Sequence, residues 1–142
     1  NFIEVFSTNS EKAKLFTRKI ALILFFYSVV VGAVMFSVVD FILITIFSQE
    51  FLQAKVTLEI LIAGSVFIIL NRLFNYVLIG MKENIKYLKI ILIGTILNII
   101  GNLYLIPIYS IEGAALSTLA TELFVLVLSI SVVHKSFNKY AN

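Results

Sequence analysis

Six polar side chains that could bind a substrate lie inside apolar stretches of this sequence. They are Asn71, Arg72, Asn75, Asn98, Asn102 and Glu122. Charged and amide groups are expensive to place in hydrocarbon, so they usually face protein or a water-filled cavity. The six residues therefore indicate a binding pathway at membrane depth, and they form the candidate site.

Arg72 is the most informative of these residues. It lies eight residues before Gly80, which is about 12 Å along a helix that rises 1.5 Å per residue. A long arginine side chain can extend toward the headgroups from such a position. However, Asn71 and Asn75 continue the same polar face, and this favours an Arg72 that faces a cavity or a protein partner.

Glu122 lies near the middle of its apolar stretch, far from either end. A carboxyl group there must be protonated, paired or in contact with water. Two roles stay open: a protonated group hydrogen-bonded to a neighbouring helix, and a group that takes part in substrate binding or proton coupling. Asn98 and Asn102 are one helical turn apart and are interpreted first as amides that bridge helices.

No catalytic or metal-binding pattern accompanies these residues. The sequence has one histidine and no cysteine. It also lacks a Ser-His-Asp set, a metal-ligand spacing, a glycine-rich phosphate loop and paired carboxylates next to a base. We therefore expect neither an enzyme nor a bound cofactor.

The composition predicts an integral membrane protein. Hydrophobic residues make up 61% of the 142 residues, charged residues only 13%, and the mean hydropathy is +1.06. A soluble domain is closer to half apolar, and this chain could not cover its surface with polar groups. The net charge of +3 does not indicate nucleic acid, because the basic residues flank apolar runs instead of forming one face.

Four apolar stretches predict an all-α, four-helix transmembrane bundle over residues 20–134. The spans are expected at about 20–47, 57–80, 87–106 and 113–133. A hydrocarbon core of about 30 Å needs about 20 helical residues, and none of the stretches alternates like a barrel strand. Pro107 is expected to end the third span before a turn over residues 107–112.

The basic residues also predict the orientation. Nine of the eleven Lys and Arg residues lie in the N-terminal flank, in or just after the connection between the second and third spans, and in the C-terminal tail. Lys and Arg are retained on the cytoplasmic side. Residues 1–19 are thus expected to form a cytoplasmic loop or interfacial stretch, and residues 135–142 a cytoplasmic tail. The absence of an initial Met and of a signal peptide suggests a piece of a longer protein.

The connection between the last two spans carries a family resemblance. Residues 102–118, NLYLIPIYSIEGAALST, resemble a signature in the C-terminal domain of polysaccharide biosynthesis and O-antigen flippase proteins, which belong to the multidrug/oligosaccharidyl-lipid/polysaccharide exporter superfamily. Residues 78–84, residues 46–51 and the pair Thr121-Glu122 are similar to further parts of that domain. Ser48 and Ser110 stand where the family usually has glycine, the residue that best tolerates a positive φ.

The resemblance implies the last four helices of a larger transporter with two helical lobes around a central cavity. Its substrate would be a polyprenyl-pyrophosphate-linked oligosaccharide that crosses the cytoplasmic membrane, and its partners would be the lipid bilayer and the N-terminal lobe of the same protein. Arg72 and the asparagines would then supply a cation for the pyrophosphate and polar walls for the sugars. Rocking of the lobes would give alternating access.

Three other functions stay open at this point. One is a cation- or proton-coupled multidrug exporter of the same superfamily, with Glu122 as the coupling acid. A second is a small four-helix multidrug transporter that works as a dimer, for which only Asp40 could serve as the acid in the first span. The third is a non-transporting membrane scaffold, which a mutual Arg72–Glu122 pair sealed from water would favour.

Overall fold

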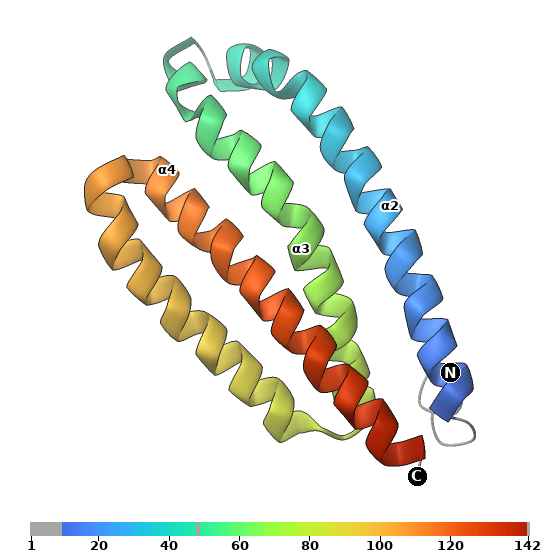
Figure 1. The fold of residues 1–142 in the computed structure, drawn as a ribbon. Coiled ribbons are helices and arrows are strands. Elements are labelled where there is room, and N and C mark those ends of the chain that lie inside the picture. The colour runs from blue at the N-terminus through green and yellow to red at the C-terminus, as the bar shows by residue number, and fades with distance from the viewer. Residues whose placement is uncertain (1–9, 48, 142) are drawn as a thin grey trace.

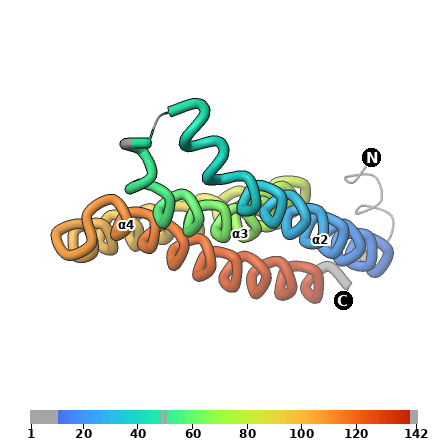
Figure 2. Tube along the Cα trace, turned by 90° about the horizontal axis from the view of Figure 1, so that it is seen from above, coloured from blue at the N-terminus to red at the C-terminus, as the bar shows by residue number. Residues whose placement is uncertain are grey.

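The computed structural model describes residues 10–47 and 49–141, and this part of the chain is almost entirely helical. The elements are α2 (Ser10–Ile42), a π-helical turn η1 (Leu43–Phe47), a 3-10 helix η2 (Gln49–Ala54), α3 (Lys55–Gly80) and α4 (Asn84–Ala141). Figure 1 shows the helices side by side, with the start of α2 and the end of α4 at the same end of the bundle. In Figure 2, η1 and η2 rise away from the layer that contains α3 and α4.

Three helices in the described residues are long and apolar enough to cross a membrane. They cover Glu11–Phe47, Phe51–Gly80 and Asn84–Lys139. The prediction of an all-α chain with long apolar helices is therefore confirmed. A multi-pass membrane location is possible on this length and composition.

The outer face of the bundle reverses the pattern of a water-soluble protein, although an apolar cluster that includes Leu78 and Phe137 is buried inside. Small hydroxyl side chains such as Ser28, Ser129 and Ser136 are buried between helices, whereas large apolar side chains point outward along every long helix. Small residues allow helices to approach closely in lipid, where apolar burial between helices gives no advantage. The inverted pattern thus has a physical explanation if hydrocarbon surrounds the outer face.

The prediction of four separate helices is wrong, because residues 10–47 and 49–141 form three long helices. Residues 84–141 form one element, α4, in which only Ser110 leaves helical geometry, with φ 53° and ψ −130°. That single residue reverses the chain, so the two arms of α4, residues 84–109 and 111–141, run back along each other (Figure 1). Pro107 does not end the helix as expected. It lies inside α4, where its fixed φ suits the helix although it removes one hydrogen-bond donor.

Glycines hold the two arms of α4 close together at the reversal. A Cβ atom added to Gly113 would overlap the backbone carbonyl of Leu105 and would lie 2.9 Å from the nitrogen of Ile106. At Gly101 an added Cβ would collide with the side chain of Ser117 on the other arm. The tight reversal therefore depends on Ser110 for its direction and on Gly113 for its backbone contact.

The turn between α3 and α4 also contains a residue with positive φ. Lys82 has φ 59°, and its N–H donates to the carbonyl oxygen of Ile79 at 2.9 Å. The N–H of Glu83 donates to the carbonyl oxygen of Leu78, also at 2.9 Å. This pair of bonds is the Schellman arrangement, which satisfies the last carbonyls of a helix. The turn is consequently short, and α4 starts at Asn84 next to the end of α3.

Helices also extend into the stretches that were expected to be loops or tails. α2 begins at Ser10, within the stretch predicted as a loop or interfacial segment, and Glu11 in its first turn suits the positive end of the helix dipole. η2 occupies most of the predicted loop over residues 48–56, and α4 continues through residues 135–141 of the predicted tail. Residues 1–9, 48 and 142 lie outside the described residues.

Candidate functional site

A cavity of about 400 Å³ lies between α3 and both arms of α4. Five of the six candidate residues line it: Asn71, Arg72 and Asn75 from α3, Asn98 from the first arm, and Glu122 from the second. Thr95, Thr118 and Thr121 add three hydroxyl groups to its wall. The structure thus brings most of the candidate site together from three stretches of helix.

A direct contact joins α3 to the second arm of α4 at this cavity. The side-chain amide of Asn71 donates to the Glu122 carboxylate oxygen Oε2 at 2.7 Å and to the Glu122 backbone carbonyl at 3.0 Å. Asn71 is only 4% exposed, and its own Oδ1 is buried without a hydrogen-bond partner. The cavity therefore contains a buried acceptor that nothing in the described chain satisfies, beside a carboxyl group.

Arg72 lies on the same cavity with its side chain exposed. It makes no hydrogen bond or ion pair with the residues that the structure describes. In particular, Arg72 and Glu122 line one cavity without forming an ion pair. The mutual pair that would have favoured a sealed scaffold is absent from the described part of the chain, and the guanidinium group is available for an anion.

The two asparagines of the first arm form a short polar ladder to the second arm. Asn102 donates to Oδ1 of Asn98 at 3.1 Å, and Asn98 donates to the hydroxyl of Thr118 at 3.5 Å. Ser117 donates to the backbone carbonyl of Asn98 at 3.1 Å. These bonds fit the interpretation of Asn98 and Asn102 as amides that bridge helical segments.

Asn75 and Asn102 lie in different surroundings from each other. Asn102 lines a separate hollow of about 330 Å³ beside Ile99, Leu103 and Pro107, instead of the main cavity. Asn75 lines the main cavity, but its buried Oδ1 has no partner in the described residues. Of the six candidates, Asn102 is therefore the one that does not line the main cavity, although it donates to Asn98 in that cavity's wall.

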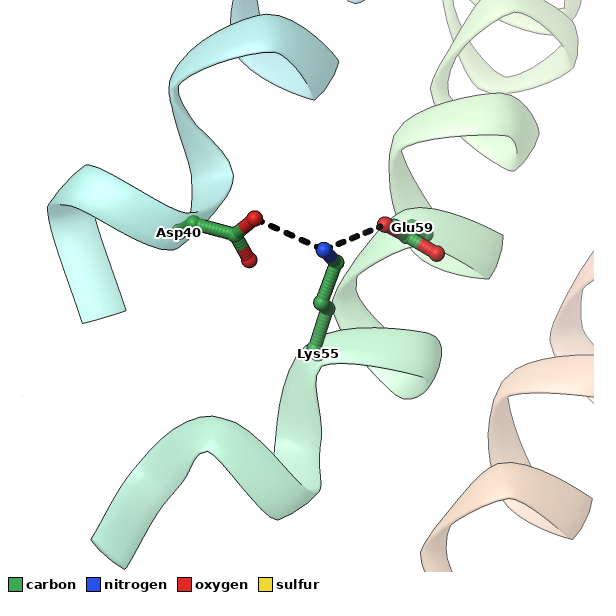
Figure 3. A network of polar contacts seen from close by, with 3 residues as sticks. All are labelled: Asp40, Lys55 and Glu59. Carbon is green, nitrogen blue, oxygen red and sulfur yellow. Dashed lines mark hydrogen bonds and ion pairs between the residues drawn. The ribbon is translucent and has the colours of Figure 1, made fainter. Parts of the chain in front are cut away.

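The sequence did not predict a charged cluster at the start of α3. The Lys55 ammonium lies 2.7 Å from the Asp40 carboxylate and 3.8 Å from that of Glu59 (Figure 3). The spacing of Lys55 and Glu59, four residues apart on one helix, was a signal for half of this cluster, whereas the contact between α2 and α3 was not visible in the sequence.

Thr95 is a further cavity residue that was not predicted from the sequence. Thr95 is three residues before Asn98 on the first arm of α4, so helical spacing could have placed the two side chains on one face. Within the described residues, no group of three or more His, Cys, Asp or Glu could hold a metal ion. The arrangement suits binding of a polar or anionic group through Arg72, amides and hydroxyls.

Comparison with known proteins does not identify a family for this chain. No family model, no curated protein and no solved structure matches the chain. The resemblance to flippase C-terminal domains consequently rests on the motifs of residues 46–51, 78–84 and 102–122 alone.

Proposed function

We propose that this chain is part of a membrane exporter that moves a lipid-linked, pyrophosphate-bearing oligosaccharide across the cytoplasmic membrane. The observation that carries the proposal is the exposed Arg72, which lines the cavity between α3 and the two arms of α4 and has no ion-pair partner among the described residues. An arginine presents a rigid fork of donors that matches phosphate oxygens, and this makes it well suited to a pyrophosphate. The motif resemblance supports the same substrate class.

The size of the cavity limits what this chain would hold. At about 400 Å³ it is near the lower end of small-molecule sites, which run from about 300 to 1,000 Å³. A pyrophosphate and an adjoining sugar suit that volume better than a complete oligosaccharide. The remaining sugars would lie against the N-terminal lobe that the proposal places on the other side of the cavity.

The proposed orientation puts the start of α2 and the end of α4 on the cytoplasmic side. Both lie at one end of the bundle (Figure 1), and the basic residues of these ends and of the α3–α4 turn lie there with them. Because α4 reverses at Ser110, its two arms would cross the membrane and return. Each arm is long enough for a hydrocarbon core of about 30 Å at 1.5 Å per residue.

Transport assays on Arg72 variants test this function. The full-length protein would be reconstituted in vesicles with a labelled polyprenyl-pyrophosphate oligosaccharide, and transfer between leaflets would be followed. Arg72→Gln should lower the transfer rate about tenfold or more, since it removes about 1.5–3 kcal/mol of charge-assisted hydrogen bonding. Arg72→Lys should retain part of the rate, because lysine keeps the charge but loses the fork geometry.

The matched control is Lys89→Gln, which removes a cation outside the cavity. Its transfer rate should stay within about twofold of the unchanged protein, because exposed surface charges contribute little. Equal rates for Arg72→Gln and Lys89→Gln would remove Arg72 from the pathway and with it the main support for the proposal.

A second candidate function, a cation- or proton-coupled exporter of the same superfamily, is favoured by the contact at Glu122. Its carboxyl group borders the cavity next to the unsatisfied Oδ1 of Asn71, and these oxygens could hold a proton or a monovalent cation. Transport that follows an imposed ion gradient, and that Glu122→Gln uncouples, would support this function. Gradient-independent transfer that survives Glu122→Gln would contradict it.

A further inference from the structure

One face of α2 carries basic residues at its start and apolar residues along the rest of its length. Lys14, Arg18, Leu22, Phe25 and Val29 follow each other at intervals of three or four residues. Side chains at this spacing lie above one another on a helix. All but Lys14 are classed as exposed, so the face is open to its surroundings from Arg18 onward.

The same face leads into an apolar groove between α2 and α3. The groove has a volume of about 230 Å³, and its walls are apolar. Gly32, Ala33 and Phe36 form the α2 side, while Ile62 and Val66 belong to the α3 side. Phe36 is eighteen residues after Arg18, which is five full turns at 3.6 residues per turn, so the two side chains are aligned along the helix.

Arg18 has the position and the charge of a headgroup contact. It makes no hydrogen bond or ion pair with another residue in the described ranges. Between Arg18 and Asp40, α2 has only one other charged residue, Lys19. The two side chains are separated by about 33 Å along the helix at 1.5 Å per residue, close to the thickness of a hydrocarbon core. A phosphate beside Arg18 would thus lie at the inner membrane surface.

We propose that this face of α2 is a binding site for one anionic phospholipid of the inner leaflet. Arg18, with Lys14 one turn before it, contacts the phosphate, and an acyl chain follows Leu22 and Phe25 toward the groove at Gly32. The inference goes beyond the transported substrate, and it rests on the proposed orientation in which α2 crosses the membrane with its start on the cytoplasmic side. Basic residues near an anionic bilayer surface each contribute about 1 kcal/mol, which corresponds to about fivefold in binding.

The combination of charge and groove selects the occupant. A free phosphate ion would use Arg18 but would gain nothing from an apolar groove. A zwitterionic lipid would fill the groove but would gain less from Lys14 and Arg18, since its headgroup carries a compensating positive charge. An anionic phospholipid satisfies both parts of the site.

Native mass spectrometry of the full-length protein in detergent tests the site. The probe is dioleoyl phosphatidylglycerol, compared with dioleoyl phosphatidylcholine and with inorganic phosphate. Arg18→Gln should lower the retained phosphatidylglycerol about fivefold. Ala33→Phe, which places a large side chain in the groove while leaving the basic residues unchanged, should lower it by a similar factor.

Lys19→Gln is the matched control. Lys19 is also exposed and one residue away, but it points about 100° around the helix from Arg18. This variant should change retention less than about twofold. Equal losses for Arg18→Gln and Lys19→Gln would reduce the site to general surface charge, and equal retention of phosphatidylcholine would overturn the preference for an anionic lipid.

The inorganic phosphate arm separates the two possible sources of the anion. Phosphate that stabilises the protein against heating as much as phosphatidylglycerol does would show a simple anion site and overturn the lipid proposal. A protein that is recovered without membranes would instead contradict the transmembrane arrangement itself. The failure of the lipid site and the failure of the proposed exporter are therefore distinguishable.

Discussion

At the scale of single residues, the contact between Asn71 and Glu122 is the feature with the largest consequences. It joins α3 to the second arm of α4 inside the polar cavity, and the buried Asn71 has no other described partner for its amide group. Hydrogen bonds between helices in a membrane contribute about 0.6 kcal/mol on average and up to about 1.7 kcal/mol. Because the Asn71 amide donates to two oxygens of Glu122, we expect its contribution to stability to lie in the upper part of that range.

Asn71→Ala should therefore destabilise the protein by about 1 kcal/mol. The change removes both bonds to Glu122 and leaves its carboxyl group without a described donor. The fraction of protein that stays monodisperse in detergent after heating measures the effect. Asn75→Ala is the control, because Asn75 lines the same cavity on the same helix but makes no side-chain hydrogen bond in the described structure. Equal losses for the two variants would contradict the role of the Asn71 contact.

The sequence identified the residues of the cavity better than their partners. Five of the six candidates line one cavity. They could be identified from the sequence because a polar side chain in an apolar helix has a high free-energy cost in hydrocarbon, and this cost does not depend on the tertiary arrangement. Which partner each group contacts depends on the rotation and register of α3 against α4. Those are relations between helices, so neither the Asn71–Glu122 bond nor the separate position of Asn102 could be predicted from helical spacing.

At the scale of the elements, α4 shows how one residue can replace a loop. Serine at φ 53° and ψ −130° adopts a conformation that a side chain disfavours, and such residues cost about 1–3 kcal/mol. The sequence predicted a turn near this point from Pro107 and Gly113, but proline and glycine indicate a turn without showing its length. The reversal takes place within one residue, because Gly113 allows the backbone of Leu105 to come into contact.

Ser110→Gly should stabilise the protein by about 1 kcal/mol, since glycine adopts the observed φ without strain. Ser110→Val should destabilise it by at least a similar amount, because a β-branched side chain is strongly disfavoured at positive φ. Midpoints of thermal unfolding in detergent measure both changes. A Ser110→Gly variant less stable than the unchanged protein would show that the Ser110 side chain contributes more than its backbone strain costs.

Two glycine-to-alanine substitutions form a second matched pair. Gly113→Ala should cost about 1–3 kcal/mol, because its Cβ would meet backbone atoms that cannot move aside. At Gly32 the new Cβ would lie 3.7 Å from a side-chain carbon of Ile62, an ordinary contact. Gly32→Ala should thus be neutral or gain up to about 1 kcal/mol from its higher helix propensity. The same unfolding measurement compares the two, and a tolerated Gly113→Ala would contradict the close reversal.

At the scale of the whole molecule, the distribution of charge and apolar surface is consistent with a single arrangement in a membrane. Large apolar side chains cover the outside of every long helix, while small polar side chains and an apolar cluster that includes Leu78 and Phe137 are buried inside the bundle. The α3–α4 turn with Lys82, followed by Lys86 and Lys89 in the first turns of α4, lies at the same end as the start of α2 (Figure 1), whereas the Asp40–Lys55–Glu59 cluster joins the end of α2 to the start of α3. This asymmetry is what the retention of Lys and Arg on the cytoplasmic side would produce.

The absence of cysteine in this chain makes that orientation directly measurable. In a background without other cysteines, Gln53→Cys in η2 should react with a membrane-impermeant maleimide in intact cells. Lys82→Cys in the α3–α4 turn should react only after permeabilisation, which should raise its labelling about tenfold, whereas the labelling of Gln53→Cys should be about equal in the two conditions. Replacing Lys82, Lys86 and Lys89 with Gln should raise the fraction of inverted molecules, because the positive residues of short loops set the orientation. Lys55→Gln, at the other end, should leave the labelling pattern unchanged, and labelling of Lys82→Cys in intact cells would contradict the cytoplasmic position of this turn.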